Sequence, residues 1–543
     1  MAVEEAFIIM SIIAVLLIIG AKSFFMLFEY DKSPWFRTQK PSHRFTIPQV
    51  PSLPILGSLI QIGHDHVRNL RAWAQEYGPI FFIRLGNRRL VIANSPESIK
   101  YLWLKHHDAL ISRPRMHTFH DVAADGKNFT IGSSPWSDSC KLLRKIVARN
   151  SSRSAIQAHV PVIDFFTTEV IARLFQDGCA SAQDLDPGAY IHEYSINVVL
   201  RLYFGTSLHY DDQADAELMR KIIYSEREMA KLRSMGNNWQ DYLPLLRLWP
   251  VRDFHATKLK KIQDEFMDTF FERLQRDINA GVSEQCVVGD ILNSEESQLS
   301  RTQIKTLCLS TIGASVLSVP GNLIMAIAWL SSVAGQTTQQ HIWEDIQANY
   351  PNGDAWERVV YEEKVASLTA FMKESLRYFS SQPLSLSRQS VKDIEYAGAT
   401  IPAGTEFHMN AWAANHDSAK YDRPFVLQPD RFLRRADEHT VDGKEKEVEH
   451  FSFGVGSRMC PGMHLGNRML YAMLARLILA YRVLPATEEK DLPELNALEC
   501  RLNRNDLALD PKPFKCGFEP RGSPDLGRIA TTLKSSAVLS ACE

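Results

Sequence analysis

Cys460 stands in a stretch whose residue types and spacing could hold a metal-binding thiolate. The stretch reads Phe451-Ser-Phe-Gly-Val-Gly-Ser-Arg-Met-Cys-Pro-Gly462, and an apolar helix is predicted directly after it. Backbone N–H groups at a helix N-terminus stabilise a thiolate, the form of cysteine that binds metals. Gly456 and Gly462 let the backbone approach the sulfur closely. The alternative is a buried structural cysteine in a glycine-rich turn.

Phe453, Gly456, Arg458, Cys460 and Gly462 match the pattern F-x-x-G-x-R-x-C-x-G, so the stretch resembles the cysteine-ligand loop of the cytochromes P450. The resemblance implies that haem b binds here, with Cys460 as the axial ligand of the iron. A thiolate in that position pushes electron density to the iron and favours O–O cleavage. The resemblance further implies that Arg458 pairs with a haem propionate, that Phe453 shields the sulfur and that Gly462 adjoins the ring.

Two motifs upstream of this loop resemble the same family. Glu374-Ser-Leu-Arg377 resembles its E-x-x-R motif, and a spacing of three places both side chains on one face of a helix. Pro429-Asp-Arg-Phe432 resembles its P-x-R-F motif. The resemblance implies a buried ionic network of Glu374, Arg377 and Arg431 with a structural, not a catalytic, role. For E-x-x-R taken alone, a solvated ion pair is the alternative.

Two more residues are expected to bind the cofactor. Arg388 resembles the propionate-binding arginine of the family, with an ordinary surface arginine as the alternative. Trp136 resembles the tryptophan of the family motif W-x-x-x-R, which lies near a propionate. In this chain Cys140 occupies the arginine position of that motif. The cationic partner is therefore left open between Lys141 and Arg144.

The helix expected to activate oxygen departs from the family pattern [AG]-G-x-[DE]-T. It reads Ala314-Ser-Val-Leu-Ser-Val-Pro320, so Leu317 replaces the acid and Ser318 replaces the threonine. Leu317 cannot relay a proton. We therefore expect Ser318 to be catalytic, with water or a substrate hydroxyl in place of the missing acid. Pro320 removes a helical hydrogen bond and is predicted to bend the helix near the haem.

Further stretches resemble the fungal phenylacetate and m-cresol hydroxylase branch of the P450s. The resemblance implies a small aromatic or polyketide-derived substrate. For Arg113, His117 and His120, packing within a loop or support of the haem is an equal alternative to substrate contact. The stretches are Ile111–Pro114 with His117–His120, Thr130–Trp136, Asn237–Arg247 and Val319–Asn322.

These resemblances imply a haem-thiolate monooxygenase of the fungal microsomal type, which hydroxylates its substrate with O2 in secondary metabolism. Electrons would come from NADPH through a separate NADPH–cytochrome P450 reductase, because no glycine-rich dinucleotide fingerprint opens a βαβ unit in this sequence. A P450-fold enzyme that catalyses a non-hydroxylating oxidation or rearrangement is the alternative. A degenerate haem-binding scaffold is a third hypothesis, against which the intact cysteine loop argues.

A membrane anchor is predicted over residues 1–30. Residues 6–28 carry one charge, Lys22, and as a helix they would span about 35 Å, enough for a hydrocarbon core of about 30 Å. Basic residues follow this segment, so the positive-inside rule predicts a single pass through the endoplasmic reticulum membrane with a cytoplasmic catalytic domain. A cleaved signal peptide is the alternative. The next most apolar stretch, about residues 307–334, is predicted to be a buried helix.

Composition is that of an ordinary globular protein. Hydrophobic residues make up 45% and charged residues 23% of the 543 residues. A formal net charge of −2 argues against a basic nucleic-acid-binding protein. We expect a proline-rich connector over 31–57 and one catalytic domain over 58–543, mainly α with a smaller β part, as in the P450 fold. Strands are predicted within 80–93 and 383–407, and helices over 253–279, 302–333, 359–379 and 463–480.

Overall fold

The computed structural model describes residues 47–126, 130–179, 183–248, 251–282, 285–293, 299–433 and 448–522, together with 526, 527, 529 and 531. The predicted anchor and residues 31–46 of the predicted connector lie outside this part of the chain. Residues 47–57 run beside the first β-strand. There the N–H of Val50 donates to the carbonyl of Phe82 (2.9 Å), and the N–H of Phe82 donates to that of Pro48 (2.8 Å).

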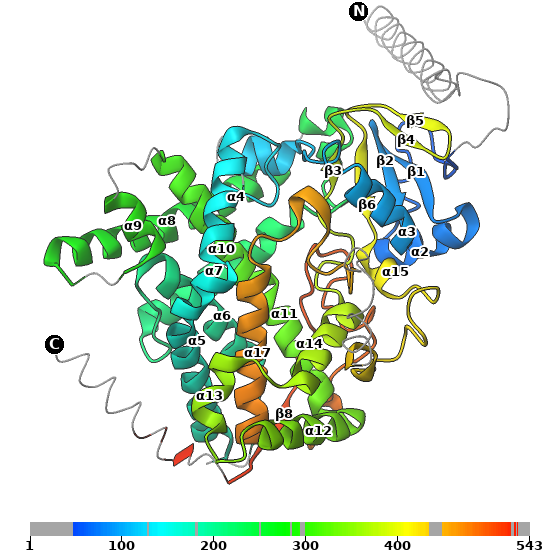
Figure 1. Ribbon diagram of the computed structural model, residues 1–543. Helices are drawn as coiled ribbons and strands as arrows, with labels where there is room; N and C mark the ends of the chain where they lie inside the picture. Colours follow the sequence, from blue (N-terminus) through cyan, green and yellow to red (C-terminus); the bar gives the residue numbers. More distant parts are fainter. Residues whose placement is uncertain are drawn as a thin grey trace, which may run out of the picture.

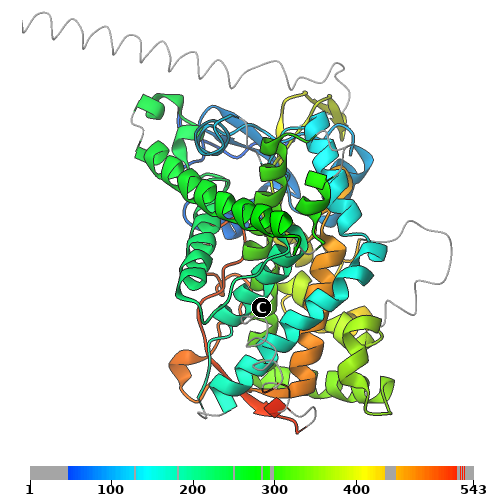
Figure 2. The same ribbon diagram turned by 90° about the vertical axis from the view of Figure 1, so that its left-hand side faces the viewer.

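A large helical body and a smaller β part make up the described molecule (Figure 1), as the composition and patterning predict. Figure 2 shows the long helix α8 lying across one outer face of the body, where it packs against α7. The helices are α2 (His66–Tyr77), α3 (Pro96–Ile99), α4 (Asp138–Asn150), α5 (Arg153–Leu174), α6 (Gly188–Phe204), α7 (Gln213–Lys231), α8 (Val251–Ala280), α9 (Val287–Asn293), α10 (Arg301–Leu317), α11 (Val319–Ser331), α12 (Val333–Asn349), α13 (Ala355–Glu362), α14 (Ala366–Phe379), α15 (Ala411–Asn415) and α17 (Met463–Ala480).

Shorter helical turns connect these elements. Three are π-helical: η2 (Lys100–Lys105), η3 (His117–Ala123) and η4 (Phe175–Cys179). Four are 3₁₀-helical: η5 (Trp239–Asp241), η6 (Pro244–Leu248), η7 (Gly456–Arg458) and η8 (Glu489–Asp491).

The main sheet has the strand order β1-β2-β6-β3. β1 and β2 form the antiparallel hairpin predicted around Gly86-Asn87, and β2 pairs in parallel with β6, a strand far away in the sequence. This pairing brings the N-terminal part of the domain against the segment that follows α14. The strands are β1 (Ile80–Leu85), β2 (Arg88–Ala93), β3 (Arg388–Gln389), β4 (Ile394–Tyr396), β5 (Ala399–Ile401), β6 (Glu406–Met409), β7 (Tyr481–Pro485) and β8 (Cys516–Pro520). β4 pairs with β5 and β7 with β8 in two small sheets.

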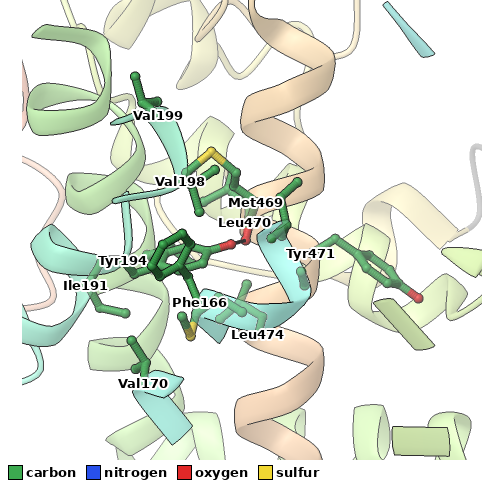
Figure 3. Close-up of a cluster of buried hydrophobic side chains, with 14 of the residues drawn as sticks. Phe166, Val170, Ile191, Tyr194, Val198, Val199, Met469, Leu470, Tyr471 and Leu474 are labelled. Carbon is green, nitrogen blue, oxygen red and sulfur yellow. Dashed lines mark hydrogen bonds between the residues drawn. The ribbon is translucent and has the colours of Figure 1, made fainter. Parts of the chain in front are cut away.

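Helix α17 runs through the core of the helical body. Every residue from Arg468 to Ala480 is buried. In Figure 3, side chains of α5 and α6 meet Met469, Leu470 and Leu474 of α17, and the hydroxyl of Tyr194 donates to the Met469 carbonyl (3.0 Å). Because α17 begins three residues after Cys460, this packing also fixes the position of the cysteine loop.

Two helices stand where one was predicted over 302–333. Helix α10 ends at Leu317, α11 begins at Val319, and Ser318 separates them. The break lies where Pro320 predicts a bend, because proline has no N–H to continue the ladder. The pair is apolar and long enough to cross a membrane, but it lies mostly inside the protein. The predicted burial of this segment is confirmed, although the segment forms two helices instead of one.

The single helix predicted over 359–379 is wrong in detail. Helix α13 ends at Glu362, and α14 begins at Ala366. Glu363 adopts a left-handed backbone (φ 49°), which ends α13. Its carboxylate pairs with Arg468 of α17 (2.8 Å). A tertiary ion pair thus accompanies a turn that helical periodicity alone does not reveal.

Candidate active site at the Cys460 loop

The cysteine loop is held by backbone contacts within itself and with η2. The N–H of Cys460 donates to the carbonyl of Phe453 (2.9 Å). Gly456 has φ +72°, and a Cβ there would overlap the carbonyl oxygen of Trp103. Gly462 has an ordinary φ of −95° and no crowded neighbour. Of these two glycines, only Gly456 is required by the protein's own backbone.

Cys460 borders a cavity between the cysteine loop and the α10/α11 break. Phe453 and Gly462 border the same cavity, as do Leu317 and Ser318. Burial raises the pKa of the Cys460 thiol, whereas a hydrogen bond from the Gly462 backbone and the positive charge of Arg144 lower it. The loop therefore supplies part of the electrostatic support that a thiolate needs.

Four arginines gather around this cavity: Arg113, Arg144, Arg388 and Arg458. All four donate to backbone carbonyls. Arg388 bonds Leu110 (2.9 Å) and Val455 (2.8 Å), and Arg458 bonds Ile111 (3.0 Å), Ile131 (2.9 Å) and Ser134 (3.0 Å). Arg113 bonds Leu386 (2.5 Å) and Ser387 (2.6 Å), and Arg144 bonds Met459 (2.7 Å).

This arginine cluster carries more positive charge than its surroundings balance. Within the described ranges, no carboxylate forms an ion pair with any of the four, and the Nε atoms of Arg113 and Arg458 are buried without a partner. Burial and the charges of neighbouring arginines together lower the pKa of Arg388 to about 9. Burial also lowers the pKa of Arg458 to about 10, where Arg144 acts in the same direction and Cys140 opposes it. Such a cluster is suited to hold a group with anionic substituents.

The surroundings of Trp136 distinguish between the two candidates for its cationic partner, Lys141 and Arg144. The guanidinium carbon of Arg458 lies 5.7 Å from the centre of the Trp136 ring. Of the two candidates for the cation, Lys141 is exposed, whereas Arg144 borders the cavity. Cys140 is buried in α4 at the position where the motif has arginine. The structure thus favours Arg144, one helical turn further along α4.

Glu374, Arg377 and Arg431 form one buried ionic network. The Glu374 carboxylate pairs with Arg377 at 2.7 and 2.8 Å and with Arg431 at 3.0 Å. Arg377 also donates to the carbonyls of Asn415 (2.6 Å) and Pro424 (2.9 Å). The Asn415 side chain in turn accepts from the N–H of Phe451 (2.9 Å). The network therefore connects helix α14 to the start of the cysteine loop.

The α10/α11 break places Ser318 and Asn322 at the cavity wall. The Asn322 amide donates to the Ser318 carbonyl (2.8 Å), and its oxygen Oδ1 is buried without a partner. Ser315, at the position of the missing glycine, turns its hydroxyl back to Ile312 (2.7 Å). Leu317 places an apolar side chain at the cavity where the pattern has an acid.

The histidines of η3 are engaged away from the cavity. The N–H of Met116 donates to Nδ1 of His120 (2.8 Å), and Nε2 of His120 contacts the Ser133 carbonyl (3.1 Å). His117 lies between Asp121 (3.6 Å) and Asp253 (3.8 Å). These contacts favour loop packing for both histidines, whereas Arg113 belongs to the arginine cluster.

Two charged residues that border the cavity were not foreseen, Glu226 and Arg233. Glu226 is buried on α7, with Ile222 and Met229 buried one turn before and after it. The sequence does contain a signal for Glu226, because this acid stands in the middle of an apolar helical face. Arg233 follows the end of α7 and has no such local signal, because its surroundings come from other elements.

Comparisons with known proteins agree with this site. A family model described as cytochrome P450 matches residues 48–518. The chain is 41% identical over 475 residues to a phenylacetate 2-hydroxylase of Emericella nidulans, covering 88% of this chain and 90% of the relative. It is 31% identical to a 3-hydroxyphenylacetate 6-hydroxylase of the same organism (87% and 89%), and 26% identical to a flavonoid-6-hydroxylase of Ocimum basilicum (84% and 89%).

The chain therefore belongs to the cytochrome P450 family. Within that family it is a monooxygenase related to fungal aromatic hydroxylases, and the prediction of a P450 enzyme is confirmed. The cofactor of the family is haem, a group with two propionates. The residues present fit it, because a cysteine at the cavity wall and a cluster of arginines without acidic partners match its iron and its anionic edge.

Replacement of Glu374 tests the buried network. We expect Glu374→Ala to destabilise the protein by about 3–5 kcal/mol, because Arg377 and Arg431 would remain charged and buried. The measurement is haem content per purified chain, together with thermal unfolding. Glu217→Ala is the control, since it breaks an exposed pair with Arg220 and should cost less than about 1 kcal/mol. Normal haem content in Glu374→Ala would contradict the assignment.

Two glycines of the cysteine loop offer a matched test of its geometry. Gly454 and Gly456 both have positive φ, at +65° and +72°, but only Gly456 has a neighbour within 4 Å of an added Cβ. We expect Gly454→Ala to cost about 1–2 kcal/mol from backbone strain alone. Gly456→Ala should prevent assembly of the folded haem protein. Equal melting temperatures and haem contents in the two variants would show that the Trp103 carbonyl does not constrain the loop.

Proposed function

We propose that this protein hydroxylates a small aromatic compound, with arylacetic acids as the first class to test. The observation that carries the proposal is the meeting of Cys460, the arginine cluster and the α10/α11 break at one cavity. The substrate class draws support from the two Emericella nidulans relatives, both named as phenylacetate-type hydroxylases.

In this proposal the cysteine loop and the arginine cluster hold haem b. Cys460 would bind the iron through its sulfur, Phe453 would cover the sulfur, and Gly462 would lie next to the cofactor. Arg388 and Arg458 bind the propionates, with Trp136 beside Arg458, and Arg144 serves as the cation that the motif lacks. Haem bound in this way supplies the oxygen chemistry, while the protein binds, orients and tunes it.

Proton delivery is the task of the chain's own polar groups at the α10/α11 break. We assign the Ser318 hydroxyl the transfer of a proton into the cavity. The buried oxygen Oδ1 of Asn322 needs a hydrogen-bond donor, and water can provide it. Since Asn322 is tied to the Ser318 carbonyl, such a water would lie beside Ser318. This arrangement would replace the acidic side chain that the family pattern has at the position of Leu317.

The redox partner and location follow from the family and the sequence. P450 monooxygenases require O2 and a reductase that supplies electrons. We propose NADPH–cytochrome P450 reductase as that partner, and a single-pass anchor over residues 1–30 in the endoplasmic reticulum membrane. A role in fungal secondary metabolism completes the proposal.

A second candidate reaction is a non-hydroxylating oxidation or rearrangement by the same haem site. Leu317 at the cavity wall favours it, because poor proton delivery would hinder oxygen insertion. The two candidates differ in their products. Only hydroxylation adds one oxygen atom from O2 to the organic product, which ¹⁸O2 labelling and mass spectrometry detect.

The first functional experiment measures product formed per NADPH consumed. The purified full-length protein is combined with a fungal reductase and with phenylacetate, m-cresol or 3-hydroxybenzyl alcohol. We expect a hydroxylated product from at least one of these compounds, in amounts that match the NADPH used. NADPH consumption that yields only peroxide, or no consumption with any of the three, would contradict the proposed substrate class.

Ser318→Ala tests the role of the hydroxyl at the helix break. Because positioned proton-transfer groups contribute about 100-fold or more, we expect product per NADPH to fall by at least about 10-fold while substrate binding is kept. Ser315→Ala is the matched control, since the Ser315 hydroxyl is bonded to its own helix (2.7 Å) and should leave product yield unchanged. An unchanged yield in Ser318→Ala would remove Ser318 from the mechanism.

A further inference from the structure

Arg233 brings an unmatched guanidinium to the cavity. It borders the cavity, its Nε is buried without a partner, and the hydrogen bond that it donates to the Thr130 hydroxyl is long (3.4 Å). The ring of Phe119 lies 5.2 Å from the guanidinium carbon. An arginine in such a position has hydrogen-bond donors to offer to a molecule in the cavity.

This arginine is separate from the cluster assigned to haem. Arg113 is affected by the charges of Arg388, Arg458 and Arg144. By contrast, the charged group that acts on Arg233 is Glu226. Arg233 follows the end of α7, whereas Arg144 and Arg388 of the cluster donate to carbonyls of the cysteine loop. Haem propionates held by the cluster would therefore leave the guanidinium of Arg233 without an anion.

Glu226 acts on Arg233 through its charge, but its carboxylate oxygens are directed to other partners. Its Oε1 accepts a hydrogen bond from Gln263 of α8 (2.6 Å), and its Oε2 lies against Gly313 of α10, 2.6 Å from the position of a Cβ. Within the described chain, neither Glu226 nor any other carboxylate forms an ion pair with Arg233. Burial raises the pKa of Glu226 to about 7, against the opposing effects of the Arg233 charge and the hydrogen bond from Gln263.

We propose that Arg233, together with the Thr130 hydroxyl, binds the carboxylate of the substrate. The planar guanidinium matches a carboxylate in two parallel hydrogen bonds. Thr130 accepts from Arg233 and has its own proton to donate. The buried ring of Phe119 packs against the guanidinium of Arg233 and supports its position. The inference rests on the proposed function and deepens it: the aromatic substrate would carry an acidic side chain, anchored away from the cysteine loop so that the ring is oriented in the cavity.

The test compares a charged and a neutral ligand of the same shape by calorimetric titration of the purified holoprotein. The ligands are phenylacetate and phenylacetamide, and the variants are Arg233→Met and Arg233→Lys. We expect the wild type to prefer phenylacetate. In Arg233→Met, phenylacetate should bind about 10- to 100-fold more weakly, the range of a lost charge-assisted contact, while phenylacetamide affinity should change less than about threefold. Arg233→Lys should recover part of the loss, since it keeps the charge without the planar fork.

Arg220→Met is the matched control. It removes the same charge from α7 at an exposed site paired with Glu217, and both ligands should bind as to the wild type. Wild type that binds phenylacetamide as well as phenylacetate, or Arg233→Met that binds phenylacetate normally, would overturn the inference. Failure of the proposed function looks different: phenylacetate would bind through Arg233, yet no hydroxylated product would form.

Discussion

Buried positive charge is the physical constraint on which this active site depends. Moving a guanidinium out of water costs several kcal/mol unless an anion or a full set of acceptors replaces the water. Around the cavity, backbone carbonyls satisfy many of the N–H groups of the arginine cluster, but carbonyls do not neutralise the charge. The loop that carries Cys460 is thus built to be completed by an anionic group, which explains why cofactor binding and folding should be tightly coupled here.

The Glu374 network shows the opposite solution within the same protein. There a single carboxylate, shared by Arg377 and Arg431, balances buried charge from inside the chain. Because Asn415 links Arg377 to the backbone of Phe451, this self-contained network can hold the cysteine loop in place before any cofactor arrives. Buried charge that is balanced within the chain therefore stabilises the fold. Buried positive charge without a carboxylate partner in the chain is available to bind an anionic cofactor or substrate.

The same reasoning separates two functions along the cavity. The arginine cluster lies at the cysteine loop, and Arg233 lies at the end of α7. The break at Ser318 places the Asn322 amide at the same cavity, beside an otherwise apolar helix pair. A helix interrupted by Pro320 can leave polar groups free to bind other molecules. In an unbroken helix, the same backbone groups would bond to one another. In this protein the helix break provides polar groups at the cavity, whereas the side chain of Leu317 is apolar.

The sequence by itself determined the elements whose signals are local. The hairpin at Gly86-Asn87 and the bend at Pro320 follow from spacing and residue type. The resemblance of the sequence motifs to those of the P450 family implied the Cys460 loop and the Glu374 network. Only the tertiary structure decided that Arg144 borders the cavity while Lys141 is exposed, that Glu363 ends α13, and that Glu226 and Arg233 border the cavity. The reason is that charge balance and burial depend on atoms from distant segments: Arg233 meets Thr130 and Phe119, and Glu226 meets Gln263 and Gly313. The periodicity of residue types along one segment does not reveal contacts with distant segments.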